Sequence, residues 1–495
     1  MKKKASLIAK GVGLAAVAGI GTSMVRAATT YKAEKISDSV QIQPENVDVD
    51  RYIKNLSAAI QIPTIANRDE SLVDWSKFDE FHAMLKEAYP LIHEKLDLQI
   101  ISTRSLMYHW QSEHPEKEPI CLLAHQDVVP VTPGTENDWT YPAFSGAVAD
   151  GFLWGRGALD IKNHLIAVME AVETLLEEGY VPERDVYLCF GHNEEVMAQG
   201  KLCGAYCMME WFKEHGIKLD SVIDEGGAIL SVKVDKVIDG HLAGVGIAEK
   251  GHVDFEIAVN AKGGHSSQPP KHSALGKLSK ILCDLENHPF KAELTDQLYS
   301  LFNEIGKKTT YPVRCIMSNL PILKPLVTKV CSNIPAVASM MRTTTAVTMA
   351  NGSPAPNVLP QKATANVNFR IMPGQTIEDV EAHIRKYAGK EAEVRVVSGN
   401  NPSKISPTDS RAFKTISEIC KSMDPKAIVA PYLVMGGTDA RNYEDVCDNI
   451  YRYSPFLMST ELLLTTHGTN ERIPLSSLAD GVAFFKRYIR ALTND

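Results

Sequence analysis

The feature that most constrains the fold is the alternation of short, continuous apolar runs with longer helical patterns. Residues 119–124, 185–191 and 221–224 are apolar runs of the kind found in buried strands. Between them, residues 161–179 and 201–215 carry apolar side chains at helical spacing. Strands that alternate with helices predict an α/β fold with a mostly parallel sheet and helices on both of its faces.

The pattern changes near residue 246. Residues 252–259 and 365–371 alternate between apolar and polar side chains, as half-exposed antiparallel strands do. The α/β pattern returns after residue 406. The sequence therefore predicts two domains: a catalytic domain split between 51–245 and 401–495, and an inserted α+β lid domain at 246–400.

The N-terminus has the layout of a secretory signal peptide. Residues 1–27 begin with three lysines at 2–4, followed by an apolar run over 11–20 and a small residue after Arg26. That run is shorter than the roughly 20 residues a membrane span needs, so we favour a cleaved signal over an uncleaved membrane anchor. Either interpretation places the catalytic part outside the cytoplasm, after a polar linker at 28–50. The net charge of −8 argues against a nucleic-acid partner.

Histidines and carboxylates gather where predicted strands end or helices begin: His125, Asp127, Asp160, Glu194, Glu195, Asp224 and, near the C-terminus, His467. Each has an ordinary alternative, such as a surface histidine, a helix N-cap or a solvated acid pair. The carboxyl ends of parallel strands share one edge of a sheet, so these groups are expected to meet there. Two imidazoles and several carboxylates suffice for two metal ions that share one acid.

The order of these motifs resembles a known family, the zinc metallopeptidases that include aminoacylase, bacterial glutamate carboxypeptidase and carboxypeptidase S. The resemblance covers roughly residues 50–490 and is closest to carboxypeptidase S and the secreted N-acyl-amino-acid hydrolases. The motifs that carry it are His125-x-Asp127, Gly155-Arg156-Gly157-x-x-Asp160, Glu194-Glu195, Asp224-Glu225-Gly226, Gly263-Gly264-His265, Pro356-Asn357-Val358, Gly436-Gly437-Thr438-Asp439-Ala440-Arg441 and His467.

The resemblance implies a di-zinc site, with two Zn²⁺ ions per subunit. One zinc would be held by His125 and Asp224, the other by Glu195 and His467, with Asp160 as the bridge. Asp127 would orient His125, and Glu194 would act as general base and acid. One departure follows Asp160: Ile161-Lys162-Asn163 replaces the family's second acid and Lys-Gly, at a point where the family backbone is often cis.

The resemblance also implies how substrate is held. His265 would reach the site of a neighbouring subunit in a homodimer formed through the lid. Arg441 and Asn357 would bind a free carboxylate, with Arg370 as a second candidate. The predicted reaction is hydrolysis of an amide bond next to that carboxylate, in a dipeptide or an N-acyl amino acid. The alternatives are a deacylase of another class of N-acylated small molecule and a non-catalytic binding module.

Overall fold

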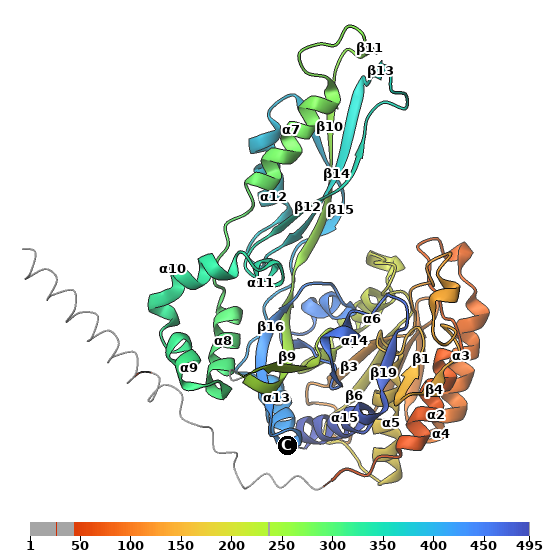
Figure 1. The fold of residues 1–495 in the computed structure, drawn as a ribbon. Coiled ribbons are helices and arrows are strands. Elements are labelled where there is room, and N and C mark those ends of the chain that lie inside the picture. Colours follow the sequence, from red (N-terminus) through yellow and green to blue (C-terminus); the bar gives the residue numbers. More distant parts are fainter. Residues whose placement is uncertain (1–25, 27–43, 236–237, 495) are drawn as a thin grey trace, which may run out of the picture.

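The computed structural model describes Arg26, residues 44–235 and residues 238–494 (Figure 1). The predicted signal segment lies outside the described residues except for Arg26, and so does the predicted linker up to residue 43. Within the described parts of the chain, none of the helices is long and apolar enough to cross a bilayer.

The largest sheet forms the core of the catalytic domain. Its strands, in spatial order, are β1 (Asp97–Ile101), β2 (Ser105–Trp110), β6 (Val186–Gly191), β3 (Ile120–His125), β7 (Ser221–Asp224), β17 (Ile450–Arg452), β9 (Ile238–Glu249), β8 (Ile229–Val234) and β18 (Leu457–Met458), with β16 (Ala427–Val434) beside β9. The pairs β6–β3, β3–β7 and β7–β17 are parallel. The predicted α/β fold with a mostly parallel sheet is confirmed.

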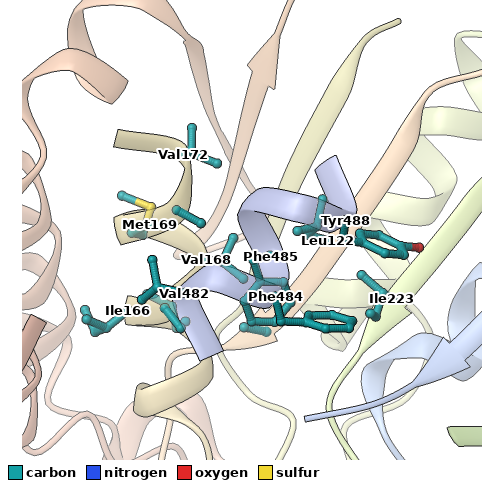
Figure 2. Close-up of a cluster of buried hydrophobic side chains, with 14 of the residues drawn as sticks. Leu122, Ile166, Val168, Met169, Val172, Ile223, Val482, Phe484, Phe485 and Tyr488 are labelled. Atoms are coloured by element: carbon teal, nitrogen blue, oxygen red, sulfur yellow. The ribbon is translucent and has the colours of Figure 1, made fainter. Parts of the chain in front are cut away.

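Helices cover both faces of this sheet because successive side chains of a strand point to opposite faces. Leu122 packs on one face with α2 (Val49–Ile60), α5 (Lys162–Glu177) and α15 (Leu478–Thr493). Figure 2 shows this layer, in which Leu122 and Ile223 lie near Phe484 and Tyr488. On the opposite face, Leu123 packs with α6 (Gly204–Glu214).

The remaining elements of this domain lie around the sheet. They are α3 (Trp75–Ala88), α4 (Pro90–Lys95), α13 (Arg411–Met423), α14 (Thr460–Leu463), a three-stranded sheet of β4 (Ala147–Ala149), β5 (Phe152–Trp154) and β19 (Arg472–Pro474), and the short 3-10 helices η1 (Glu70–Leu72), η2 (Glu136–Asp138), η3 (Gly200–Leu202), η4 (Asp439–Asp445) and η5 (Leu475–Ser477).

A separate antiparallel sheet forms the inserted domain, which extends away from the large sheet (Figure 1). Its order is β12 (Thr344–Asn351), β14 (Lys362–Ile371), β10 (Gly251–Asn260) and β15 (Ala392–Asn400). Alternate residues of β10, such as Phe255 and Ile257, are buried under α7 (Ala274–Asn287) and α12 (Ile377–Ala388). The short pair β11 (Gly264–His265) and β13 (Val358–Leu359) lies at the far tip.

Four further helices come from the range predicted as the lid: α8 (Asp296–Lys308), α9 (Tyr311–Met317), α10 (Leu320–Cys331) and α11 (Pro335–Ser339). They are not part of the lid sheet. Helix α8 packs against β16 and β9 of the large sheet, α9 packs on α8, and α10 packs on α9.

Candidate metal centre

The ends of three neighbouring strands position the centre. Strand β3 ends at His125, which is paired in register with Gly191 at the end of β6. Glu194 and Glu195 follow β6, and Glu225 follows β7 on the other side of β3. Parallel pairing therefore brings these side chains to one edge of the sheet, as the sequence predicted.

Two groups of ligand-type atoms share Asp160. The first group is His125, Asp160 and Glu225, and the second is Asp160, Glu195 and His467. Nε2 of His125 lies 3.2 Å from Oδ1 of Asp160 and 3.5 Å from Oε1 of Glu225. Nε2 of His467 lies 2.9 Å from Oδ2 of Asp160 and 3.0 Å from Oε2 of Glu195. Each oxygen of Asp160 thus faces one histidine, which is the geometry of a bridging carboxylate.

Glu225 occupies the position that the sequence assigned to Asp224. Both carboxylate oxygens of buried Asp224 accept backbone N–H groups, from Glu225 at 2.8 Å and from Ala440 at 2.8 Å. Asp224 therefore fastens the end of β7 to η4 and does not face Asp160. Neighbouring residues of a strand point to opposite sides, so only one of two adjacent acids can face the site. The sequence shows the acid pair but not which member faces inward.

Asp127 holds the loop after β6 as well as the ring of His125. Its two carboxylate oxygens accept the N–H groups of Glu194 and Glu195, each at 3.1 Å. Nδ1 of His125 lies 2.9 Å from the backbone carbonyl oxygen of Asp127 and 3.4 Å from its Oδ1. Donation from Nδ1 to these oxygens leaves Nε2 as the lone-pair nitrogen toward Asp160. Asp127 is therefore placed to orient His125, mainly through its carbonyl.

Glu471 anchors the loop that carries Asp160, a role that the sequence reading missed. Oε1 of this fully buried residue accepts the N–H groups of Gly157, Leu159 and Asp160 at 3.0, 2.8 and 3.1 Å, and Oε2 pairs with Arg156. Because Glu471 follows His467 by four residues, the same contacts bring His467 to Asp160. The peptide bond between Asp160 and Ile161 is cis, although Ile161-Lys162-Asn163 departs from the family pattern.

Carboxylates outnumber histidines in this centre, and their pKa values reflect it. Burial raises the pKa of Glu225 to about 8, and that of Glu194 well above its usual value. Burial also raises the pKa of Asp160, but hydrogen bonds from His125 and His467 outweigh it and hold that pKa well below its usual value. Hydrogen bonds to Asp160 and Glu195 raise the pKa of His467 to about 10. Crowded acids beside two imidazoles form a donor set suited to two divalent cations.

The predicted substrate-binding residues fall into two places. Arg441 and Arg370 line one cleft beside the metal centre. Arg441 donates to the carbonyl oxygen of Asn401 at 2.7 Å and lies 3.6 Å from the buried carboxylate of Glu249.

His265 and Asn357 lie instead at the tip of the lid, where Ser266 donates its N–H to the carbonyl oxygen of Asn357 at 2.9 Å. Within one chain, therefore, Asn357 does not join Arg441, because its loop is carried away on the β11–β13 pair (Figure 1). His265 is exposed there, and its predicted reach into a second subunit stays a prediction.

Comparison with known proteins decides the family. The model of peptidase family M20/M25/M40 matches residues 121–491, most of the chain. The chain belongs to this family. Among its relatives, a probable carboxypeptidase S-like protein of Dictyostelium discoideum is 34% identical over 418 residues, covering 84% of this chain and 79% of that protein. An N-fatty-acyl-amino acid synthase/hydrolase of Mus musculus is 32% identical over 447 residues, covering 88% and 86%.

Solved structures of M20 proteins share the fold. An M20 metallo-carboxypeptidase from Sulfolobus solfataricus gives a TM-score of 0.64 at 18% identity, covering 89% of this chain and 98% of that chain. A dinuclear metal-binding M20 peptidase from Bacillus subtilis gives a TM-score of 0.58 at 13% identity, covering 90% and 98%.

Two cavities meet at the metal centre of this M20 member. Asp160 and Glu225 lie in the wall of the first, which has a volume of about 410 Å³ and is otherwise mainly apolar, with Leu159, Leu230, Leu242, Leu301, Met340, Met458 and Leu463. The second, of about 430 Å³, is more polar and is lined by Glu194, Glu195 and His467 together with Arg370 and Arg441. The centre thus separates an apolar compartment from one that carries two guanidinium groups.

Proposed function

We propose that this chain is a di-zinc amidohydrolase that cleaves the amide bond between a long apolar acyl group and an amino acid with a free carboxylate. The observation that carries the proposal is the pair of unlike cavities on either side of the carboxylates around Asp160. An N-acyl amino acid has the same division, with a hydrocarbon chain and a carboxylate on opposite sides of one amide bond.

The apolar cavity supports the acyl half of the proposal. Its volume of about 410 Å³ falls in the range of pockets that enclose small-molecule ligands. Each buried CH₂ contributes about 0.8 kcal/mol, so a chain of ten carbons supplies about 8 kcal/mol before the cost of ordering it. A charged or short polar side chain of a substrate would gain little binding free energy from these leucines and methionines.

The polar cleft supports the amino-acid half. Arg441 and Arg370 present guanidinium groups, which bind carboxylates through two parallel hydrogen bonds. Burial lowers the pKa of Arg370 from its usual value, yet the group remains charged at neutral pH. A substrate carboxylate placed in this cleft leaves the amide carbonyl beside Asp160.

The proposed metal ligands follow the two groups that share Asp160. His125, Asp160 and Glu225 would hold one zinc, and Asp160, Glu195 and His467 the other. Two bound zinc ions would lower the pKa of a water molecule and polarise the amide carbonyl.

Glu194 is the general base and acid in this scheme. Its Oε2 lies 4.0 Å from Nε2 of His125, close to both groups but in neither. Burial raises its pKa, which suits a carboxylate that takes a proton from water and gives it to the leaving nitrogen.

The proposal includes the setting of the enzyme. It would act outside the cytoplasm, secreted or held by an N-terminal anchor. It would form a homodimer through the lid, in which His265 and Asn357 from a second copy complete the polar cleft. The exposed position of both residues at the lid tip supports this arrangement, because in one chain they have no substrate to meet.

A dipeptidase or carboxypeptidase is the second candidate, and the polar cleft is the observation that favours it, since a peptide also ends in a carboxylate. A deacylase of other N-acylated molecules would not need two arginines. A binding module would not need Glu194 beside a complete ligand set.

The test is hydrolysis by the purified, zinc-loaded protein of lauroyl-, acetyl- and aminoacyl-phenylalanine, each with a free acid and as the methyl ester. We expect the lauroyl free acid to be the best substrate and each ester to be poor. Glu194→Gln should abolish turnover while two zinc ions per chain remain bound, measured by plasma mass spectrometry. A preference for the dipeptide, or no bound metal in the wild-type protein, would overturn the proposal.

A further inference from the structure

Helices α9 and α10 present an apolar face to solvent. On α10, Ile322, Leu326 and Val330 are spaced four residues apart and are 67%, 60% and 56% exposed. Side chains at this spacing lie in one row along a helix. Ile316 of α9 and Ile334 after α10 are also exposed. Single exposed apolar residues are common on proteins, but a continuous row of them marks an interaction surface.

The same segment is strongly basic in an acidic protein. Residues 305–377 contain no Asp or Glu, although the whole chain carries a net charge of −8. Lys308 and Lys329 are exposed on α8 and α10, and Lys329 borders the apolar row next to Val330. We call Ile316, Ile322, Leu326, Val330 and these lysines the α10 surface. An apolar row bordered by cations is the pattern of a helix that lies on an anionic membrane surface.

The α10 surface is at the outer edge of the molecule, on a helical layer that leads to the apolar cavity (Figure 1). Helix α8 separates α9 and α10 from β16, and its Leu301 lines the cavity. Met340, directly after α11, lines it too. One group of helices therefore contributes both to the exposed apolar row and to the wall of the cavity.

We propose that the α10 surface docks the protein on anionic phospholipid bilayers. Its apolar row would enter the interface, and the lysines would meet the phospholipid headgroups. Docking in itself needs only this surface. The added benefit, that an acyl chain could pass from lipid into the cavity, rests on the proposed function. A second copy of the same face fits less well, because two such faces would bring like charges together without a compensating carboxylate in 305–377.

The test uses the full chain and vesicles of phosphatidylcholine, with or without phosphatidylglycerol. Hydrogen–deuterium exchange is followed peptide by peptide, so that protection of residues 311–335 is separated from any effect elsewhere. We expect protection there only with the anionic vesicles. Vesicle sedimentation gives the partition coefficient.

Two paired substitutions test the surface, and one single substitution elsewhere serves as a control. Lys308→Gln with Lys329→Gln should weaken partitioning about thirty-fold and flatten its dependence on salt, since each lysine contributes about 1 kcal/mol at an anionic surface. Ile322→Ser with Leu326→Ser should weaken it at least about tenfold. Ile100→Ser, which changes a 57% exposed isoleucine on edge strand β1, is the matched control and should change nothing.

Two results would overturn the docking proposal: no protection of 311–335 by anionic vesicles, or protection that rises with protein concentration in their absence, which would reveal a second copy. Hydrolysis of a soluble acetyl amino acid separates the two proposals, because the docking variants should keep it. Intact vesicle binding without any amidase activity would leave docking standing and overturn the proposed function.

Discussion

The choice of Glu225 over Asp224 as the inward-facing acid makes different predictions for these two adjacent residues. The changes are Asp224→Asn and Glu225→Gln, studied first in metal-free protein. The carboxylate of Asp224 accepts two backbone N–H groups, so an amide in its place turns an NH₂ toward one of them. Losing a hydrogen bond to a buried charged acceptor costs about 1.5–3 kcal/mol. Burial also raises the pKa of Asp224 to about 6, a cost of folding at pH 7 that the uncharged asparagine removes. The two effects oppose each other, so Asp224→Asn should change the free energy of unfolding little.

Glu225→Gln should raise the free energy of unfolding. Burial lifts the pKa of Glu225 from 4.5 to about 8, so the folded state binds the proton more tightly than the unfolded state does. The sign follows from linkage: the cost of folding grows as pH rises from the unfolded pKa toward the folded one. At pH 7 this cost is about 3 kcal/mol, and the uncharged glutamine removes it. Below pH 4 the gain should vanish.

Urea unfolding measured by tryptophan fluorescence reports on the right domain, because all five tryptophans lie between residues 75 and 211. Zinc content after reloading gives the second measurement. We expect Asp224→Asn to retain two ions and Glu225→Gln to lose one. If Asp224→Asn loses an ion while Glu225→Gln keeps both, the sequence-based assignment is right and the geometric argument is wrong.

Glu471→Gln should leave the buried guanidinium of Arg156 without its charged partner and lower the free energy of unfolding, measured by denaturation, by about 3–5 kcal/mol. It should also weaken zinc binding, measured by chelator competition, about 10–100-fold. Unchanged zinc affinity would show that the loop does not need this anchor. Arg441→Ala and Arg370→Ala should raise KM for the free-acid substrate and leave KM for the methyl ester unchanged. An equal rise for both substrates would show that these arginines do not bind the substrate carboxylate. In an acyl series, kcat/KM should rise up to about fourfold per CH₂ until the apolar cavity is full, and a flat series would argue against acyl binding there.

Much of the fold and half of the site follow from local patterns in the sequence. The apolar runs that became β3, β6 and β7 are visible because buried parallel strands need continuous apolar side chains. Their carboxyl ends then locate His125, Glu194 and Glu195 without further information. His467 could be joined to them only through the family resemblance, because it comes from the far end of the chain.

What the sequence could not supply depends on which way side chains face after folding. The choice between Asp224 and Glu225 needs the orientation of β7 relative to β3. Glu471 looks like a surface residue until its contacts with the loop at 157–160 are seen. The range 246–400 reads as one insertion, yet its helix α8 packs on β16 and β9 of the large sheet, with α9 on α8 and α10 on α9.

The place of β17 in the large sheet has a consequence for biosynthesis. This strand, made from residues 450–452, lies between β7 and β9, which are made more than 200 residues earlier. While the ribosome is still translating the inserted domain, the sheet consists of two pieces with open edges, the kind of surface on which chains aggregate. His467 is also still missing, so a nascent or prematurely terminated chain can assemble the ligand group around His125 at most. A complete enzyme forms only after synthesis has ended, and a chaperone or an unfolded translocation route would have to cover those edges until then.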